Sequence, residues 1–377
     1  MKEASIIIPT YNEKGNIERL VNILEEEIFP KIKNYKMSIL VADDSSPDGT
    51  ADEVKSLMKK WENLDLNIGE KKGLGAAYIR AMTYAIDKMG ADVLFEMDAD
   101  LSHNPKKIPE FLKKIDEGYD FAIGTRYSHG GSIPKNWGLL RKAFSVFGNL
   151  LVRTILMRFS IHDWTGGFRA IKKEVFLKEK SELTAFRGYT FQVSFLHKAI
   201  RDKFKIAEVP IAFTDRTLGK SKIAPKEYII DLLKYVITAR IKEIMTGPFG
   251  KFLMVGGTGF IINLSLYYLL VNKTILSLVL ANTIAAQVAI FSNYNLNNLW
   301  TFKERKIMNV ESYLLKMLMF FITSNIGVFI FQNGTIKLGE LLYGRKFYLI
   351  YFLIGTGLLL VWNFTMYSKI IWRVKKK

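Results

Sequence analysis

Two aspartates spaced two residues apart, Asp98 and Asp100, have the spacing in this chain that most directly suggests chemistry. They follow an apolar run at residues 93–97 that has the composition of a buried strand. Carboxylates in this position could hold Mg²⁺ or Mn²⁺, which prefer oxygen ligands, and such a metal would neutralise a leaving diphosphate. An isolated pair of this kind more often caps a turn or a helix, so the interpretation depends on the surrounding segments.

Two further polar segments follow predicted strands, at residues 9–13 and 43–50. Ligands of open α/β sheets bind beyond the carboxyl ends of the strands, so we expect these segments and residues 98–103 to form one pocket. Turn chemistry alone explains the middle of the second segment. The carboxylate of Asp43, in contrast, could accept the N–H groups of a nucleobase. A weaker signal, the glycine-containing segment 71–75, could cradle a phosphate.

A sheet is needed to bring these segments together. Short runs rich in β-forming residues alternate with amphipathic helical patterns, which predicts a parallel sheet covered by helices, a Rossmann-like α/β core. The predicted strands are residues 6–9, 38–42, 93–97 and 121–124. The predicted helices include residues 15–28 and 75–88.

The second part of the chain differs in composition from the first. The 377 residues carry a formal net charge of +18 and contain no cysteine, which excludes disulfides, zinc-cysteine sites and thiol catalysis. Residues 252–371 contain four long apolar stretches with very few acidic side chains between them. We expect a catalytic domain at residues 1–225, an interfacial amphipathic helix at 226–248 and an all-α membrane domain at 249–377.

Four candidate transmembrane helices lie in the membrane domain, each close to the roughly 20 residues needed to cross a bilayer. They are residues 252–271, 275–293, 314–331 and 347–367. Four crossings return the chain to its starting side, and the basic loop at 303–306 and the basic tail at 369–377 then agree with the positive-inside rule. Lys337, Arg345 and Lys346 oppose this topology mildly. Because no signal peptide is recognisable, we expect an integral membrane protein whose catalytic domain and both termini are cytosolic.

The positive charge of the catalytic domain is concentrated at residues 126–160, which contain no acidic residue. Such an excess suits nucleic acid, an anionic membrane surface or an anionic small substrate, and the neighbouring membrane domain argues against nucleic acid. Two amphipathic stretches, residues 139–159 and 226–244, pair an apolar face with Lys and Arg. Core helices would look similar, but the basic faces favour the interface of the lipid bilayer. The histidines show no metal-ligand spacing, so turn or core roles are expected.

These segments, in their order and spacing, resemble those of family 2 glycosyltransferases with the GT-A fold, specifically dolichyl-phosphate mannose synthases. Downstream segments carry the same resemblance at residues 124–127, 163–169, 188–192, 208–211 and 215–222. The similarity covers about the first 240 residues. Residues 252–257 and 293–302 resemble the GtrA-like membrane module.

The resemblance implies which residues bind the donor and a metal. The nucleotide sugar would be held by Pro9, Tyr11, Glu13, Val41, Asp43, Asp98, Ala99, Asp100, Arg126, Arg216 and Lys222. Mg²⁺ or Mn²⁺ would be bound by Asp98, Asp100 and Ser102. Asp98, Asp100 and Arg126 would be the catalytic residues. Ser194 departs from the pattern, because many relatives have an acidic residue there.

The resemblance also implies an acceptor site made of cationic side chains. Arg126, Arg141, Arg216 and Lys222 would hold the acceptor phosphate. Arginine suits this role because its planar fork can donate two parallel hydrogen bonds to phosphate oxygens. Alternatively, Arg141 and Lys142 could contact only the headgroups of anionic lipids.

The implied reaction is the metal-assisted, inverting transfer of mannose from GDP-mannose to dolichyl or another polyprenyl phosphate, for glycosylation on the far side of the membrane. One alternative is the same chemistry with another sugar, such as glucose from UDP-glucose. A second is a processive polysaccharide synthase, for which the expected Q-x-x-R-W motif is not found. A third is a non-catalytic lipid-phosphate binding or flipping protein, which would have no need of Asp98 and Asp100.

Overall fold

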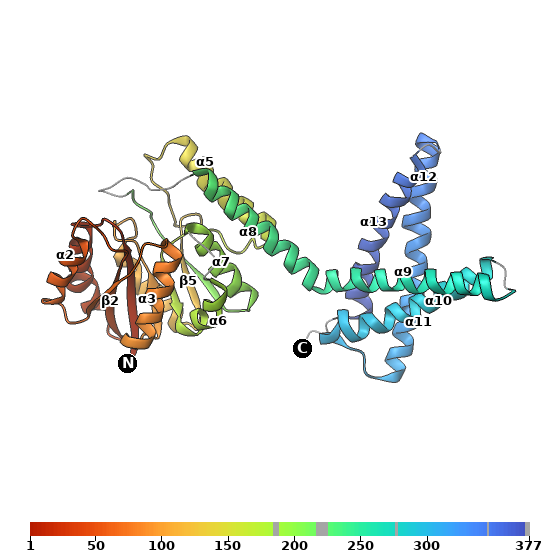
Figure 1. The fold of residues 1–377 in the computed structure, drawn as a ribbon, viewed down its shortest axis with the longest axis horizontal. Coiled ribbons are helices and arrows are strands. Elements are labelled where there is room, and N and C mark those ends of the chain that lie inside the picture. Colours follow the sequence, from red (N-terminus) through yellow and green to blue (C-terminus); the bar gives the residue numbers. More distant parts are fainter. Residues whose placement is uncertain (184–187, 216–224, 276–277, 345–346, 374–377) are drawn as a thin grey trace. The chain divides into compact units, whose positions relative to one another are not determined.

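A computed structural model describes the chain except for residues 184–187, 216–224, 276–277, 345–346 and 374–377 (Figure 1). The described residues divide into two compact units, Met1–Ala239 and Arg240–Lys377. The first unit is an α/β domain and the second is helical. This division agrees with the predicted change from a catalytic to a membrane domain.

The first unit is built on a seven-stranded sheet of order β3-β2-β1-β4-β6-β5-β7. Its strands are β1 (Lys2–Thr10), β2 (Tyr35–Asp43), β3 (Leu64–Ile68), β4 (Val93–Glu96), β5 (Phe121–Thr125), β6 (Arg169–Lys172) and β7 (Ile206–Pro210). β6 runs antiparallel to both of its neighbours, β4 and β5. The prediction of a wholly parallel sheet is therefore wrong at β6. The chain stays at the carboxyl edge of the sheet after β5 and returns across the sheet as β6.

Helices cover both faces of the sheet, so its central strands are buried on both sides. One face packs against α1 (Asn16–Ile23), α2 (Thr50–Met58) and α4 (Ile108–Asp116), and the other packs mainly against α3 (Leu74–Met89), α6 (Lys173–Leu183) and α7 (Gly188–Arg201). Strand β1 shows the alternation expected of a pleated strand, because Ile6 and Ile8 face the first group of helices and Ile7 faces the second.

The four predicted strands and both predicted helices are confirmed, but β3, β6 and β7 were not predicted. Strand β3 reads Leu-Asp-Leu-Asn-Ile and lies at the edge of the sheet, where only one side chain is buried. Strand β6 has four residues, two of them charged. Such sequences lack the apolar pattern that identifies a strand, and their pairing comes from tertiary context.

Helix α5 (Leu139–Leu156) exposes its apolar side chains. Leu139 is 85% exposed, and Phe144 and Phe147 are 64% and 66% exposed, whereas Val152 and Leu156 are buried. A core helix would bury most of its large apolar side chains, so that interpretation of residues 139–159 is wrong. The prediction that this helix lies in a membrane interface remains open.

The helix predicted for residues 226–248 is α8 (Pro225–Thr246). Leu232 and Val236 on this helix are buried in the core of the first unit, and the boundary between the two units follows at Ala239. The predicted boundary at residue 225 therefore separates a helix from the core against which its first part packs. Its interfacial location stays a prediction.

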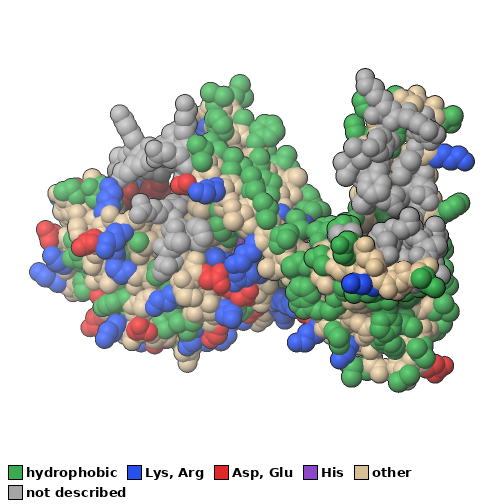
Figure 2. Space-filling model, turned by 45° about the vertical axis from the view of Figure 1, so that its right-hand side comes forward, with side chains coloured by type: hydrophobic (Ala, Val, Ile, Leu, Met, Phe, Trp, Pro, Cys, Tyr) green, Lys and Arg blue, Asp and Glu red, His purple; other side chains and the backbone are tan. Residues whose placement is uncertain are grey.

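The second unit has helices at all four predicted spans. They are α9 (Pro248–Lys273), α10 (Leu278–Leu296), α11 (Val310–Gly327) and α13 (Tyr348–Met366). Among the described residues, the run Val310–Phe331 is long and apolar enough on its own to cross a membrane. On the face shown in Figure 2, hydrophobic side chains dominate the described part of this unit, whereas Lys, Arg, Asp and Glu are interspersed on the first unit.

The third predicted span is longer than expected. After α11 the chain continues through the π-helical turn Val328–Asn333 into α12 (Gly334–Tyr343). Lys337 therefore lies within a helix and not in the loop between two spans. The predicted topology, with Lys337 mildly opposing it, stays a prediction.

Aromatic residues join the helix ends that carry the basic loop and tail. The rings of Phe302 and Trp372 stack 4.6 Å apart, and Tyr294 contacts both Trp372 and Phe320. The indole N–H of Trp372 donates a hydrogen bond of 2.9 Å to Asn298 Oδ1. Aromatic contacts and one satisfied amide thus fix the π-helical turn Asn297–Thr301 against the end of the chain.

The two central strands β4 and β6 share a buried ion pair. Glu96 lies opposite Arg169 in the register, both side chains are fully buried, and Arg169 Nε is 3.7 Å from Glu96 Oε2. Arg169 also donates hydrogen bonds to the carbonyl oxygens of Gly166 and Gln192. Burial raises the pKa of Glu96 from 4.5 to about 7, although the guanidinium opposes this effect.

This raised pKa predicts a specific pH dependence of stability. Between pH 4.5 and pH 7 the unfolded chain loses a proton that folded Glu96 retains, so its contribution is complete below about pH 4.5 and falls until about pH 7. Relative to Glu96→Gln, the wild-type Tm should decrease across this window and then level off. Scanning fluorimetry of the purified protein measures this difference. Glu18→Gln, on an exposed surface, is the control, and a constant difference between wild type and Glu96→Gln would contradict the assignment.

Candidate active site

The predicted pocket segments all leave the sheet at one edge. Thr10 lies opposite Asp43 in the register of β1 and β2, so the segments that follow these strands begin side by side. Strand β4 is parallel to β1. Strand β6 lies between β4 and β5, and its residue Arg169 lies opposite both Glu96 of β4 and Ile123 of β5. The segments beginning at residues 97 and 126 therefore start at the same edge. The expected meeting of these strand ends at one edge of the sheet is confirmed, and the single ligand pocket that they would form stays a prediction.

Asp43 holds the turn that follows β2. Its Oδ1 accepts hydrogen bonds from Thr10 Oγ1 at 2.8 Å and from Ser46 Oγ at 2.5 Å, and its Oδ2 accepts one from the Ser46 N–H at 2.8 Å. The residue is completely buried. These bonds explain why a carboxylate ends the strand, and the predicted contact between Asp43 and a nucleobase stays a prediction.

The other predicted donor contacts near β1 and β2 differ in their surroundings. The Lys71 ammonium lies 3.4 Å from the centre of the Tyr11 ring, which brings the glycine-containing segment to the end of β1. The Glu13 carboxylate accepts a hydrogen bond from Asn16 Nδ2 at the start of α1. The side chains of Val41 and Ala99 are buried in the core, so only their backbone could meet a donor.

The aspartate pair lies on a tight loop after β4. The side chain of Asp98 is 43% exposed, whereas Asp100 is almost buried and accepts a hydrogen bond of 3.0 Å from the backbone N–H of Ser102. Leu101, between Asp100 and Ser102, adopts a left-handed conformation with φ of 60°. This conformation is uncommon for residues other than glycine and reverses the chain within one residue.

The loop has the oxygen atoms that a divalent metal needs. Besides the two carboxylates, the Oγ of Ser102 is buried and has no hydrogen-bond partner within the described chain. Among the described residues, no group of three or more Asp, Glu, His or Cys side chains is arranged so that it could hold a metal ion by itself. Mg²⁺ is commonly held by one or two carboxylates together with substrate phosphates, so Asp98, Asp100 and Ser102 fit a metal that a diphosphate completes. We keep this as a prediction.

His103 packs against the loop at residues 97–102 that carries the aspartate pair, which we call the metal loop for its predicted role. Its Nδ1 accepts a hydrogen bond of 3.2 Å from the backbone N–H of Asp98, and its ring stacks 5.1 Å from that of Phe168. Burial lowers the pKa of His103, although the neighbouring carboxylates of Asp98 and Asp100 oppose this effect. The ring is therefore neutral at pH 7. The expected turn or core role is confirmed for this histidine.

The segment after β7 lies across the metal loop, which sequence reasoning missed. The backbone N–H of Thr214 donates to the Ser102 carbonyl oxygen at 3.3 Å, and Thr214 Oγ1 donates to the Leu101 carbonyl oxygen at 3.1 Å. The ring of Phe213 contacts His103 and Trp137, with centroids 5.8 Å apart in both pairs. The signal that could have identified these residues is their position immediately before residues 215–222, one of the segments that carry the family resemblance.

Arg126 uses its fork to bind Asp163. Its Nε and Nη2 donate hydrogen bonds of 2.7 and 2.8 Å to the two carboxylate oxygens of Asp163, and Nη2 also donates to Thr165 Oγ1. Burial alone would raise the pKa of Asp163, but the Arg126 charge and these hydrogen bonds hold it below its usual value. The described contacts therefore make Arg126 a support of the loop at 163–165, and its phosphate contact stays a prediction.

Arg141 lies near the start of α5 in a more accessible pair. Its Nη1 is 3.3 Å from both carboxylate oxygens of Asp215, and its guanidinium stacks 4.0 Å from the centre of the Trp137 ring. The side chain is 43% exposed. Trp137 and Phe213 thus connect Arg141 to the metal loop. The other predicted phosphate ligands, Arg216 and Lys222, lie outside the described residues.

Ser194 stands where the resemblance leads us to expect an acidic residue, and it does not take over the role of a carboxylate at the site. Its side chain is buried in α7, where its hydroxyl donates a hydrogen bond of 2.9 Å to the Phe191 carbonyl oxygen. This residue therefore contributes to the packing of a helix on the sheet, and it supplies no charge.

Comparison with protein families agrees with the two units. Residues 5–178 match the Glycosyl transferase family 2 model, and residues 251–372 match the model of the GtrA/DPMS transmembrane domain. The solved structures of glucosyl-3-phosphoglycerate synthase from Mycobacterium tuberculosis include one with Mn²⁺, UDP-glucose and phosphoglyceric acid. It is 16% identical with a TM-score of 0.45, over 63% of this chain and 79% of that one.

Two curated relatives are considerably more similar. Dolichol-phosphate mannosyltransferase of Pyrococcus furiosus is 34% identical over 316 residues, which cover 83% of this chain and 85% of the relative. Polyprenol monophosphomannose synthase of Mycolicibacterium smegmatis is 41% identical over 224 residues, which cover 58% of this chain and 80% of the relative. With its GT-A-like domain followed by a GtrA-like membrane domain, this chain belongs to the dolichol-phosphate mannosyltransferase family of family 2 glycosyltransferases.

Proposed function

We propose that this membrane protein transfers mannose from GDP-mannose to dolichyl or another polyprenyl phosphate, with inversion at the anomeric carbon. The observation that carries the proposal is the loop with Asp98, Asp100 and the unpartnered hydroxyl of Ser102, which Phe213 and Trp137 connect to Arg141. The residues that we assign to a metal thereby lie near the cation that we assign to a phosphate, in a chain whose relatives are named dolichol-phosphate mannosyltransferase and polyprenol monophosphomannose synthase.

The reaction needs charge compensation at two places. An oxygen of the acceptor phosphate attacks the anomeric carbon, a new carbon–oxygen bond forms, and the bond to the diphosphate breaks so that GDP leaves. A Mg²⁺ or Mn²⁺ ion bound by Asp98, Asp100 and Ser102 would stabilise the charge that develops on GDP. Arg141, with Arg216 and Lys222 from outside the described residues, would hold the acceptor phosphate beside it.

No side chain is needed as a general base in this mechanism. A phosphate monoester carries about 1.5 to 2 negative charges at neutral pH, so the nucleophile arrives deprotonated. The two acidic residues that we consider near the aspartate pair already have structural partners. Asp163 is bound by Arg126, and Glu13 is bound by Asn16.

The exposed apolar side of α5 supports a location of the acceptor site at the membrane. Leu139, Phe144 and Phe147 lie on the same helix as Arg141, so an apolar surface and a phosphate-binding cation come from one element. A helix of this kind buries its apolar face at the boundary between headgroups and acyl chains. We further propose that the catalytic domain and both termini are cytosolic.

The first test concerns the metal pair. Asp100→Ala should abolish mannose transfer, and EDTA should have the same effect on the wild type until Mg²⁺ or Mn²⁺ is restored. Radiolabelled GDP-mannose and UDP-glucose, each with dolichyl phosphate, measure turnover and donor choice together. The control is Asp87→Ala, on an exposed position of α3. A folded Asp100→Ala protein that keeps more than about a tenth of wild-type turnover, a loss below ~1.4 kcal/mol, would refute the metal role.

The second test separates a phosphate ligand from a lipid-headgroup contact. Arg141→Ala should lower kcat/KM by on the order of 10²-fold, mostly through the KM for the lipid acceptor. Lys142→Ala is the matched control, since Lys142 is a neighbouring, partly exposed cation whose ammonium donates to the Lys135 carbonyl oxygen. Equal losses in both variants that disappear in zwitterionic bilayers would instead show that Arg141 contacts only anionic headgroups.

The third test asks whether a protein carboxylate takes a proton. The rate at low acceptor concentration should rise with pH up to about 6, the second pKa of the phosphate, and then stay constant. Asp163→Asn and Glu13→Gln should keep this shape even if they lower the rate. An additional ionisation in the wild-type profile that either variant removes would identify a general base and overturn the mechanism.

A further inference from the structure

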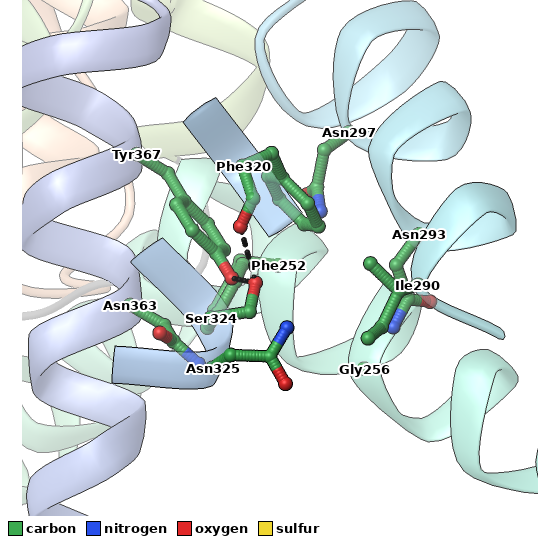
Figure 3. Close-up of a pocket in the computed structure, with 10 residues that line it drawn as sticks. All are labelled: Phe252, Gly256, Ile290, Asn293, Asn297, Phe320, Ser324, Asn325, Asn363 and Tyr367. Atoms are coloured by element: carbon green, nitrogen blue, oxygen red, sulfur yellow. Dashed lines mark hydrogen bonds between the residues drawn. The ribbon is translucent and has the colours of Figure 1, made fainter. Parts of the chain in front are cut away.

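A polar pocket lies among the helices of the membrane domain. It has a volume of about 250 Å³ and is lined by residues of α9, α10, α11 and α13 and of the π-helical turns that follow α10 and α13. In Figure 3, Asn293 and Asn297 on one side face Ser324, Asn363 and Tyr367 on the other. The pocket therefore requires the assembled helices, and no single helix forms it.

The lining is polar but uncharged. Asn293, Asn297 and Asn363 each have a buried side-chain carbonyl oxygen without a hydrogen-bond partner in the described part of the chain. Asn297 is only 1% exposed. None of the lining residues that the structure describes is acidic or basic. A polar atom left unpaired inside a protein costs about 1–3 kcal/mol, so three such atoms around one cavity indicate that something else supplies the donors.

Two hydroxyl groups add further hydrogen-bond acceptors to the three amide oxygens. Ser324 Oγ donates a hydrogen bond of 2.6 Å to the Phe320 carbonyl oxygen and lies 2.6 Å from the Tyr367 hydroxyl. Because the serine proton is used, the tyrosine must donate to serine, and the tyrosine oxygen keeps its acceptor sites. The dashed lines in Figure 3 mark both contacts.

The chemistry of the lining selects the class of ligand. A phosphate or carboxylate offers only acceptors and binds most strongly to cationic donors, and no such donor is among the described lining residues. A ligand with several hydroxyl groups would satisfy the amide oxygens, and the rings of Phe252 and Phe320 supply apolar contact area. Drug-sized ligands occupy about 300–1,000 Å³, so this smaller cavity fits a single headgroup.

We propose that this pocket binds the neutral, hydroxyl-rich headgroup of a lipid, a hexosyl group such as the one that the catalytic domain transfers. The choice of a hexose rests on the proposed function. Gly256 lies eight residues after Pro248, the first residue of α9, so the pocket is about 12 Å inside that helix end. A sugar that enters from the membrane surface could reach this depth while its lipid chain stays in the bilayer.

Gly256 offers a way to close the pocket. A Cβ added to this residue would meet no atom within 4 Å, so a larger side chain can grow into the cavity without displacing backbone. Gly257 is equally open but does not line the pocket, which makes it a matched control on the same helix. Gly259 is unsuitable, because a Cβ there would collide with the Asn293 amide.

The test uses the full-length protein in phosphatidylcholine nanodiscs. The probes are a dodecyl β-mannoside with a diazirine next to the sugar and a dodecyl phosphate with the same group. After irradiation, mass spectrometry should find the mannoside, and not the phosphate, on residues 252–256, 290–297, 320–325 or 363–367. Gly256→Leu should reduce this labelling at least about tenfold, equivalent to ~1.4 kcal/mol, and Gly257→Leu should not. Equal labelling by both probes, or labelling that Gly256→Leu leaves unchanged, would overturn the proposal.

A second variant covers the case in which Gly256→Leu does not fold. Asn363→Leu removes one acceptor at similar volume and should reduce labelling about fivefold, the effect of one hydrogen bond of ~1 kcal/mol. Unchanged labelling in this variant would also overturn the proposal. Displacement of the probe by excess farnesyl phosphoryl mannose or by a monoglycosyl diacylglycerol identifies the natural source of the headgroup, and displacement by neither refutes the site.

Parallel assays of mannose transfer separate this inference from the proposed function. Wild-type protein that transfers mannose without labelling of the pocket would refute the pocket and leave the enzyme activity intact. Protein that is labelled in the pocket but inert with GDP-mannose would refute the proposed donor and leave the headgroup site intact.

Discussion

Strand β1 is hydrogen-bonded to β2 on one side and to β4 on the other, and this register decides which side chains reach the site. Thr10 lies opposite Asp43, so its hydroxyl can bind that carboxylate and close the turn after β2. Because side chains alternate between the faces of a strand, a slip of one residue would exchange the side chains that face the two helix layers. The position of the metal loop depends on the same register, since β4 ends two residues before Asp98.

The cations near this edge fall into two energetic classes. Arg126 and Asp163 form a bidentate, nearly buried pair, and breaking such a pair by removing one partner costs about 3–5 kcal/mol. Arg141 and Asp215 form a partly exposed pair, for which about 0–1 kcal/mol is typical. An arriving phosphate can therefore replace Asp215 at little cost, but it cannot easily replace Asp163. The structure thus favours Arg141 as the exchangeable cation and Arg126 as part of the framework.

Local sequence predicted the features that depend on local chemistry. The aspartate pair, four of the seven strands and the four apolar helices of the membrane domain could all be predicted, because each is encoded within a short window. The hydrogen bond from Thr214 to the Leu101 carbonyl oxygen joins residues 113 positions apart, and the Arg126–Asp163 pair spans 37 positions. Nothing in either segment identifies its partner. The reversed direction of β6 was equally invisible, since strand direction is set by the path of the chain and not by side-chain pattern.

The exposed apolar side chains of α5 shape the surface of the domain, whereas its buried apolar side chains stabilise the fold. Phe144 and Phe147 contribute little to the core, whereas Val152 and Leu156 on the opposite side are completely buried. Changes at the first pair can retune the surface that the helix presents while the free energy of unfolding stays nearly constant. Changes at the second pair would destabilise the domain before they altered any surface. The outward surface of this helix can therefore change at little cost to the fold that positions Arg141.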